Sequence, residues 1–429
     1  MHDAAAIAIL GGGASGLTLA HTLADLGFSR VVVFERELEV GGKSCTVMID
    51  GRAHDLGATM GVPIDYRHVV GFSAEAGIPT VPFPRETHYS LQRGGAVQRS
   101  RRELPRVLTQ AARYVALHAA TWRGELHRAD PQLFAPWSRV VARHGLEDAS
   151  RRMLCYRTGY GYGFDDEVPA VMYASLVQPQ TLLGLTVGEP FVWRGGTQPI
   201  WKALARRLGA ANVEIRTATP VTRIARDGRG VTVRSGRRSE RFDHLVIACD
   251  PQLALAALDA SSAERSWFEK VHTYPYATFA CEIEGLATGR ASVGYVDENM
   301  QRDRMGHPMA WVKRYADQDI YIVHLFAPSE LPDTEVARRI AADVARLGGR
   351  LVRVRAARRW RFFPHFASSF MRAGGLTAID RWQGQSRTYL IGEVLSFATL
   401  ARVTEHAVRF AHRMASEPAG TTVAVRLAS

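Results

Sequence analysis

The sequence contains no apolar run long enough to cross a lipid bilayer, although 46% of its 429 residues are hydrophobic. A spanning helix needs about 20 consecutive apolar residues. The short segment Ala4–Leu10 has the character of a signal-peptide core, but Asp3 precedes it and there is no basic stretch before it. Its cleavage would also remove the glycine motif that follows. We therefore expect a cytoplasmic protein, long enough for two or three domains with a sizeable core.

Cysteine is scarce and widely spaced, and no CxxC pair or other ligand spacing occurs. The four thiols are Cys45, Cys155, Cys249 and Cys281. This spacing predicts reduced, structural cysteines. The sequence also lacks the spacing of a metal site or of a nucleophile triad. We therefore predict no metal, and we assign no side chain as catalytic.

Lysine is rare too, so arginine supplies the formal net charge of +12. The only lysines are Lys43, Lys202, Lys270 and Lys313. Between Gln98 and Arg152 there are eleven arginines and five acidic residues, a difference of six that is half of the total excess. Nucleic-acid binding would need such charge beside base-stacking aromatic residues. We therefore predict no nucleic-acid partner.

The most informative stretch lies at the beginning of the chain. An apolar segment (7–10) leads into a glycine-rich turn (11–16), an apolar-periodic helix follows, and a second strand (31–34) ends at Glu35. Strand, glycine turn, helix, strand and acid is the order of the βαβ unit that binds a dinucleotide. This context makes a simple flexible turn an improbable explanation of the glycines.

Three of the glycines and the acidic residue of this unit each have a physical role. Gly11 permits the tight turn, Gly13 lets the backbone approach a pyrophosphate, and Gly16 lets the helix pack close to the sheet. The first N–H groups of the helix then face the phosphates with the positive end of the helix dipole. Glu35 lies where its carboxylate can accept hydrogen bonds from a ribose.

The remaining chain predicts an α/β protein in three parts. Helical periodicity dominates from about Glu103 to Leu183, and strand-like segments surround one helix between Ser266 and Gly384. The predicted division is a discontinuous Rossmann-type dinucleotide domain (1–78, 190–265 and 385–415), an antiparallel-sheet substrate domain (79–97 and 266–384) and a helical domain (98–189).

Seven motifs spread from end to end carry a resemblance to a known family. They are GGK (41–43), GATMGVP (57–63), GYGFDDEVPA (161–170), WRGGTQ (193–198), YVDENMQRDRMGHPM (295–309), FFPH (362–365) and GEVLSF (392–397). With them the chain resembles the flavin-dependent polyunsaturated fatty acid (linoleate) isomerases, a branch of the flavin amine-oxidase superfamily. The resemblance implies FAD rather than a nicotinamide cofactor, in a fold with an FAD domain, a sheet-bearing substrate domain and a helical domain.

The dinucleotide motif and the resemblance together indicate the residues that would bind FAD without a covalent bond. These are Gly11, Gly13, Ser15, Gly16, Glu35, Arg36, Gly42, Lys43, Gly57, Ala58, Thr59, Met60, Val221, Gly392, Glu393 and Thr399. We expect Glu393 to bond a ribityl hydroxyl, because two like charges at a phosphate would repel. The helix beginning near Thr399 would direct its N-terminal dipole at the flavin ring.

The family's chemistry is a double-bond shift in which flavin N5 takes a hydride from a methylene between two cis double bonds and returns it elsewhere. The resemblance implies that Arg85 is the nearest match to a carboxylate-binding arginine. It also implies that Leu185 stands where the family can place an aromatic gate. Tyr160, Tyr162, Phe363 and His365 complete the predicted substrate pocket. Arg85 is equally explained as a surface residue, and His365 as a hydrogen-bonded core histidine.

The sequence therefore favours an FAD-dependent isomerase that acts on a polyunsaturated fatty acid or a similar apolar or amphiphilic compound, with no net redox change. An FAD-dependent oxidase or desaturase of natural-product biosynthesis is the alternative. A flavin-binding protein without catalysis is disfavoured by the intact pocket motifs. The substrate's identity, its regiochemistry and the oligomeric state stay open at this level.

The basic segment after Gln98 has two interpretations. One is a solvated domain face over a packed stripe. The other is weak peripheral contact with an anionic membrane surface, by an apolar row with flanking arginines. The row would be Leu104, Val107, Leu108, Ala111 and Val115, and the arginines Arg101, Arg102, Arg106 and Arg113.

Overall fold

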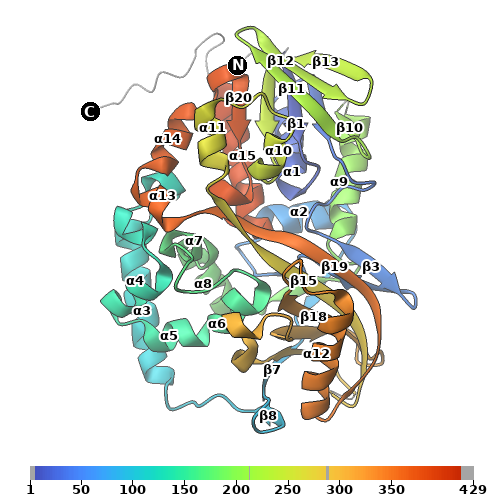
Figure 1. The fold of residues 1–429 in the computed structure, drawn as a ribbon, viewed down its shortest axis with the longest axis vertical. Helices are drawn as coiled ribbons and strands as arrows, with labels where there is room; N and C mark the ends of the chain where they lie inside the picture. The colour runs from blue at the N-terminus through green and yellow to red at the C-terminus, as the bar shows by residue number, and fades with distance from the viewer. Residues whose placement is uncertain (1–4, 212, 287–288, 417–429) are drawn as a thin grey trace.

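The computed structural model describes residues 5–211, 213–286 and 289–416. Residues 1–4, 212 and 287–288 of the predicted domain ranges lie outside the described residues. Figure 1 shows a small parallel sheet with its helices in the upper half, a large curved sheet at the lower right, and a group of short helices at the lower left.

The upper half is built on a five-stranded parallel sheet. Its strands, in spatial order, are β10 (Glu214–Arg216), β2 (Arg30–Phe34), β1 (Ala6–Leu10), β14 (His244–Ile247) and β20 (Thr388–Leu390). They come from three separate stretches of the chain, and each falls within a range predicted for the FAD-binding domain. The exact domain boundaries remain a prediction.

The two faces of this sheet pack against different layers, because side chains alternate along a strand. Ile7, Ile9 and Val33 pack with residues of four helices. Ala8, Val32 and their neighbours face the opposite side, where they pack with residues of a three-stranded sheet. The helices are α1 (Ala14–Asp25), α2 (Arg67–Glu75), α9 (Gln198–Ala210) and α15 (Leu400–Ser416). The small sheet consists of β11 (Val221–Asp227), β12 (Gly230–Ser235) and β13 (Arg238–Phe242).

The large sheet has seven strands and is antiparallel except between β16 and β7. In spatial order they are β19 (Arg350–Phe366), β15 (Val271–Glu284), β18 (Ile320–Phe326), β17 (Ala310–Lys313), β16 (Ser292–Tyr295), β7 (Arg85–Ser90) and β8 (Gly95–Val97). Helix α12 (Asp333–Arg346) packs on it. The predicted strands at 278–283, 309–314 and 320–326 and the predicted helix at 334–347 are confirmed. Strand β19 was not predicted, because its frequent arginines hide the apolar alternation.

Helices form the third part, between β8 and a small strand, β9 (Phe191–Trp193). They are α3 (Leu104–Thr121), α4 (Trp137–His144), α5 (Glu147–Arg152), α6 (Leu154–Arg157), α7 (Ala170–Leu176) and α8 (Pro179–Val187). Pro136 and Pro169 occupy the N-cap positions of α4 and α7, so proline does interrupt the helical pattern.

The apolar row predicted along α3 lies on one side of the helix but is only partly packed. Val107 and Ala111 are partly buried and turn inward, whereas Leu104, Leu108 and Val115 are exposed. Residues at spacings of three and four share one side of a helix, and here the border between the packed and the open face runs along that side.

Two further small sheets join the halves. One is the hairpin of β3 (Thr46–Ile49) and β4 (Arg52–Asp55), and the other contains β5 (Met60–Gly61), β9 and β6 (Thr80–Pro82). Within the described ranges, none of the helices is long and apolar enough to cross a membrane.

Candidate dinucleotide and substrate cavity

A cavity of about 1120 Å³ runs from the carboxyl edge of the parallel sheet to the inner face of the large sheet. Pockets for a single small ligand typically measure about 300–1,000 Å³. The cavity therefore has room for more than one such ligand. Fifteen of the sixteen residues predicted to bind FAD line it, and Gly16 is the exception.

Gly16 acts on the cavity through the backbone. A Cβ atom at this position would lie 2.0 Å from the carbonyl oxygen of Gly11, so only glycine lets α1 approach the end of β1. Gly13 occupies the N-cap position of α1, and no side chain caps the helix there. The first N–H groups of α1 are therefore available to an anion at the cavity wall.

The residues at this end fit a pyrophosphate. The Ser15 hydroxyl is buried, lines the cavity and has no hydrogen-bond partner among the described residues. Gly42 lies so close to Gly13 that a Cβ on it would be 3.1 Å from the Gly13 Cα. A phosphate oxygen would satisfy the Ser15 hydroxyl and the α1 N–H groups together.

Glu35 is held in the orientation that ribose binding requires. One carboxylate oxygen accepts a hydrogen bond from the Gly12 N–H at 2.8 Å, and the other accepts one from the Glu37 N–H at 2.9 Å. The side chain is buried, which limits its rotation. Its remaining lone pairs can accept hydrogen bonds from a ribose diol. Arg36 and Val221 line the cavity beside it.

The cavity wall carries an ion pair that the sequence did not predict. Lys43 Nζ contacts Glu393 Oε2, and both residues line the cavity. Glu393 therefore has a cationic partner before any ribityl group is considered. The predicted bond from Glu393 to a ribityl hydroxyl stays a prediction.

Gly57 and Ala58 are fixed by a buried polar network. Asp55 accepts hydrogen bonds from the Thr46 hydroxyl at 2.6 Å, the Thr197 N–H at 2.9 Å and Arg314 at 3.1 Å. Thr197 in turn donates its hydroxyl proton to the Ala58 carbonyl at 2.7 Å. Burial raises the pKa of Asp55, against the opposing effects of Arg314 and these hydrogen bonds. Because Arg314 follows β17, the network ties the cofactor end to the large sheet.

The cavity wall between the cofactor end and β7 is aromatic. Tyr160, Tyr162 and Leu185 line it, as the sequence predicted. The Tyr160 hydroxyl lies 3.3 Å from the Tyr295 hydroxyl, and the Tyr162 hydroxyl donates to the Ala398 carbonyl at 3.2 Å. Burial raises the pKa of Tyr160 and Tyr162, so both phenols stay protonated.

Three further lining residues were missed from the sequence. Tyr276 and Phe362 have ring centroids 4.8 Å apart, and the Tyr276 hydroxyl lies 2.7 Å from His324 Nδ1. Burial lowers the pKa of His324 to about 4, so its imidazole is neutral near pH 7. A histidine inside the apolar strand IYIVHLF was the one available signal.

The end nearest β7 is polar. Glu86 accepts hydrogen bonds from the hydroxyls of Tyr156 at 2.6 Å and Tyr295 at 3.1 Å. Arg99 pairs with Asp297, whose carboxylate also meets His88. Glu86, His88, Arg99 and Tyr156 all line the cavity.

Arg152 stands apart from this network. Its side chain lines the cavity, and within the described part of the chain it forms no ion pair with an acid. Its carbonyl oxygen accepts a hydrogen bond from Arg99 at 2.8 Å, which fixes the end of α5. Arg152 is therefore the cation at this end that is available to an anionic ligand.

Three predicted substrate residues do not line the cavity. Arg85 is exposed on β7, where strand alternation turns its neighbours Glu86 and His88 inward instead. Phe363 is fully buried, and Phe362 and Pro364 line the cavity in its place. The extra residue of a β-bulge lies here, and Phe363 takes a φ of 53°.

His365 is a core histidine, which was the alternative explanation given for it. Its Nδ1 lies 2.8 Å from the Phe363 carbonyl, and its ring stacks on Phe363 at 4.5 Å. Burial lowers its pKa to about 4. A neutral imidazole away from the cavity wall does not act on a substrate directly.

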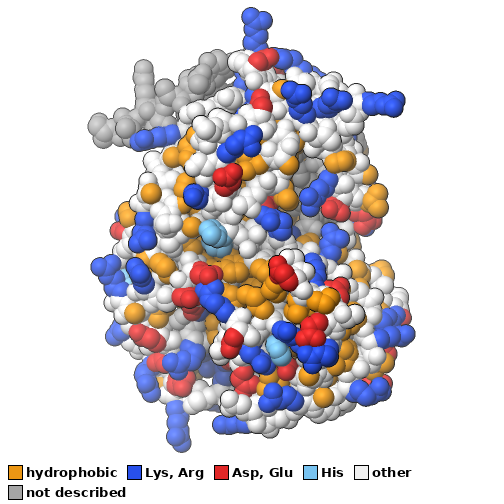
Figure 2. All heavy atoms as spheres, viewed as in Figure 1, with side chains coloured by type: hydrophobic (Ala, Val, Ile, Leu, Met, Phe, Trp, Pro, Cys, Tyr) orange, Lys and Arg blue, Asp and Glu red, His pale blue; other side chains and the backbone are white. Residues whose placement is uncertain are grey.

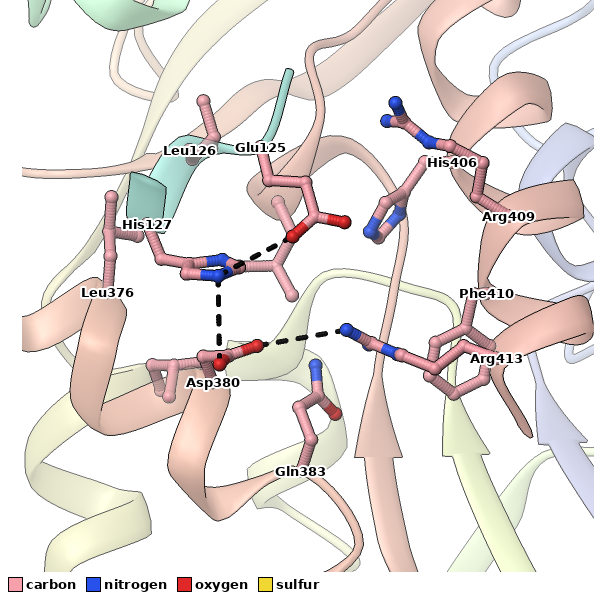
Figure 3. A pocket seen from close by; sticks show the side chains of 12 residues that line it. Glu125, Leu126, His127, Leu376, Asp380, Gln383, His406, Arg409, Phe410 and Arg413 are labelled. Carbon is pink, nitrogen blue, oxygen red and sulfur yellow. Dashed lines mark ion pairs between the residues drawn. The ribbon is translucent and has the colours of Figure 1, made fainter. Parts of the chain in front are cut away.

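A second, smaller cavity of about 100 Å³ lies between α14 (Gly375–Trp382), α15 and the turn at 126–128 (Figure 3). The His127 ring lies between Glu125 at 3.5 Å and Asp380 at 3.7 Å, and Arg413 reaches Asp380 at 3.8 Å. Burial lowers the pKa of His127. The charges there neutralise one another, and the volume is well below that of a typical ligand pocket.

Comparison with known proteins identifies the family. The model of the flavin-containing amine oxidoreductases matches residues 14–417. AofH of Mycobacterium tuberculosis, whose name assigns it to the flavin-containing monoamine oxidases, is 28% identical over 265 residues, 57% of this chain and 57% of its own length. A polyenoic fatty acid isomerase from Ptilota filicina is 24% identical over 251 residues, 51% of this chain and 50% of its own. The match thus spans about half the length of these curated relatives.

A solved structure is similar over nearly the whole fold. It is a CLA-producing fatty acid isomerase from P. acnes, with a TM-score of 0.88 at 25% identity, covering 96% of this chain and 99% of that one. These matches agree with three features of the site. They are the glycine turn, the buried Ser15 hydroxyl without a hydrogen-bond partner among the described residues, and the Glu35 carboxylate held by two backbone N–H groups. The chain belongs to the flavin-containing amine oxidoreductase family and is an enzyme that uses FAD.

Proposed function

We propose that this enzyme isomerises a polyunsaturated fatty acid, or a similar amphiphilic unsaturated compound, without net oxidation or reduction. The observation that carries the proposal is the extent of the likeness to the P. acnes isomerase, which covers 96% of this chain and 99% of the other. The long cavity, apolar and aromatic at its centre and basic at Arg152, supports the same substrate class.

Bound FAD supplies a hydride acceptor and donor at N5 of its ring. The chain itself contributes the shape of the cavity, the exclusion of water from it and the faces of aromatic rings. Tyr162, Tyr276 and Phe362 surround the space beyond Ala58, with centroid distances of 5.5 Å and 4.8 Å between successive rings. Aromatic faces attract positive charge and would stabilise charge that develops on an unsaturated chain. The phenols and His324 are neutral near pH 7, and the charged pair of Lys43 and Glu393 lies next to these rings, with Lys43 Nζ 5.6 Å from the Phe362 ring centroid.

We propose Arg152 as the residue that holds the substrate carboxylate, in place of Arg85. A guanidinium matches a carboxylate in charge and in hydrogen-bond geometry. Arg99 is already paired with Asp297. The carboxylate of Glu86 is satisfied by two phenols, so it does not need Arg152 as a partner.

We also propose that FAD is held without a covalent bond in a cytoplasmic protein. Cys249 lines the cavity, and burial raises the pKa of its thiol to about 12, so the thiol is not nucleophilic near pH 7. All four cysteines are free thiols, which suits a reducing compartment. Acid precipitation should leave the protein colourless and release the flavin into the supernatant.

An FAD-dependent oxidase or desaturase of small-molecule biosynthesis is the second candidate. Glu86 favours it, since a carboxylate at the cavity wall suits a cationic substrate better than an anionic one. The name of the M. tuberculosis relative points to the same class of amine chemistry. An oxidase would require an electron acceptor such as oxygen after each turnover, and an isomerase would not.

Anaerobic incubation with linoleic acid separates the two candidates. The isomerase should build up conjugated-diene absorbance over many turnovers while the flavin stays oxidised at steady state. An amine oxidase should ignore linoleic acid, bleach once with a primary amine or polyamine, and recover only on admission of oxygen. Bleaching by linoleic acid that oxygen alone reverses would contradict the isomerase and support a fatty acid desaturase.

A further inference from the structure

Helix α3 has one packed face and one open face. On the packed face the Tyr114 hydroxyl donates to the Val177 carbonyl at 2.6 Å, and His118 Nε2 lies 3.2 Å from the Ala174 carbonyl. On the open face Leu108 is 61% exposed, Leu104 40% and Val115 37%. The helix therefore presents large apolar side chains to solvent along most of its 18 residues.

The open face carries positive charge without negative charge. No acidic residue occurs from Leu104 to Gly124. Arg106 and Arg113, seven residues apart, share one edge of the face, while Leu104, Leu108 and Val115 share the other. Exposed alanines at 112, 116, 119 and 120 fill the space between the two edges.

The arginines of this face are not neutralised by their neighbours. Arg101, Arg102, Arg106 and Arg113 form no ion pair with any residue that the structure describes. Helix α12 shows the contrast, because Arg338 and Arg339 both pair there with Glu335. Figure 2 shows Lys and Arg side chains along the left edge of the molecule, where Figure 1 places α3, α4 and α5.

We propose that the open face of α3 docks on an anionic lipid surface. The leucine edge would enter the boundary between headgroups and acyl chains, and the arginine edge would contact the anionic headgroups. A nucleic acid would use the arginines but leave the leucines in water, so the combination favours lipid. The contact is a property of the helix and holds whichever compound the cavity converts.

The strength of the contact follows from the charge. Each arginine near an anionic surface increases the binding constant about fivefold. Three arginines would then contribute about a hundredfold. Screening beyond a distance of about 8 Å at physiological ionic strength makes the attachment reversible and sensitive to salt.

The test is co-sedimentation of the FAD-loaded enzyme with phosphatidylcholine vesicles, with and without phosphatidylserine, followed by flavin absorbance in the pellet. The wild type should sediment with the anionic vesicles at low salt, detach as salt rises, and ignore pure phosphatidylcholine. The triple variant Arg101→Gln, Arg102→Gln, Arg106→Gln should bind about a hundredfold more weakly. The double variant Leu104→Ser, Leu108→Ser should lose severalfold while keeping its salt dependence.

A charge-matched control removes three exposed arginines elsewhere: Arg229→Gln, Arg237→Gln, Arg346→Gln. It should bind within a few-fold of the wild type. Flavin content and thermal unfolding confirm that each variant is folded. A wild type that ignores anionic vesicles at low salt would overturn the proposal, as would equal losses in the two triple variants. Self-association that the leucine variant abolishes, without vesicle binding, would assign the face to a second copy of the chain.

Discussion

The two ends of the large cavity hold their ligands by different means. At the glycine turn the wall is mostly main chain: the N-terminus of α1, Gly13 against Gly42, and Gly57 against the Lys43 carbonyl. At the β7 end the wall consists of side chains, among them Glu86, Tyr156 and Arg152. Main-chain groups cannot be removed by substitution and can only be blocked, whereas side-chain groups can be deleted one at a time. We therefore expect abrupt effects at the first end and graded effects at the second.

The largest effect should come from Gly57→Ala. A Cβ there would lie 1.8 Å from the Lys43 carbonyl oxygen, which belongs to the backbone and cannot rotate away. The backbone around Gly57 and Lys43 must shift, and overpacking of this kind costs about 1–3 kcal/mol of stability. We expect the variant to be purified without bound FAD, as measured by the ratio of flavin to protein absorbance.

Gly71→Ala is the matched control for that change. Gly71 lies on the exposed face of α2 with nothing within 4 Å of the added methyl group, and alanine favours a helix by about 1 kcal/mol over glycine. It should keep its flavin and keep or slightly raise its thermal midpoint. If Gly57→Ala binds FAD as tightly as Gly71→Ala does, the backbone at the cofactor end shifts more easily than the close contact with Lys43 indicates.

The next effect tests the side-chain end. Under the proposed function, Arg152→Gln removes a charge-assisted hydrogen bond worth about 1.5–3 kcal/mol. KM for linoleic acid should rise by about tenfold or more, with FAD content unchanged. Arg85→Gln, a change of the same kind one residue from the cavity wall, should leave KM within about twofold. The methyl ester of the substrate should bind both variants and the wild type alike. A rise in KM for Arg85→Gln alone would restore the assignment made from the sequence.

This difference also explains which parts of the site could be predicted. The main-chain end needs glycines at fixed spacings, followed by an acidic residue at the end of the next strand. Gly11, Gly13 and Glu35 therefore predict this end from the sequence. The side-chain end depends on strand direction and register. Arg85 and Glu86 are neighbours, and only the pairing of β7 with β16 decides that Glu86 faces inward. The β-bulge at Phe363 could not be predicted either. It buries Phe363, which was predicted to line the cavity, and its neighbours Phe362 and Pro364 line the cavity instead. The parallel sheet and α12 were predictable from periodicity, whereas arginine-rich β19 was not.

A buried histidine of the large sheet, away from the cavity wall, should make the protein sensitive to acid. His365 has a pKa of about 4 in the folded protein against 6.5 for the free side chain, because burial disfavours its charged form. As the pH falls, His365 is therefore protonated in the unfolded chain before it is protonated in the folded protein. The contribution of the neutral His365 to the free energy of unfolding is complete above pH 6.5. It is lost as the pH falls toward about 4, at about 1.4 kcal/mol per pH unit for one proton.

Asparagine at this position keeps a neutral N–H donor for the Phe363 carbonyl but cannot titrate. His365→Asn should therefore be less stable than the wild type near neutral pH and lose stability more slowly on acidification, by about one proton in slope. Urea unfolding measured across this pH window checks the slope. Equal slopes for the two proteins would mean that His365 is protonated, or solvated, more easily than its burial implies.

The smallest effect concerns the mouth of the cavity at α8. Leu185 lines the cavity and is 43% exposed, while Leu183 is 52% exposed and does not line it. Leu185→Phe would add a ring at the cavity wall, and Leu183→Phe adds the same ring two residues away. Because the ring narrows a path without removing a contact, the barrier to entry should change by less than about 1 kcal/mol. We expect kcat/KM for a long-chain substrate to fall by about threefold in Leu185→Phe and to stay unchanged in Leu183→Phe, with equal FAD content. Equal values for both variants would show that the substrate reaches the flavin by a route that does not pass Leu185.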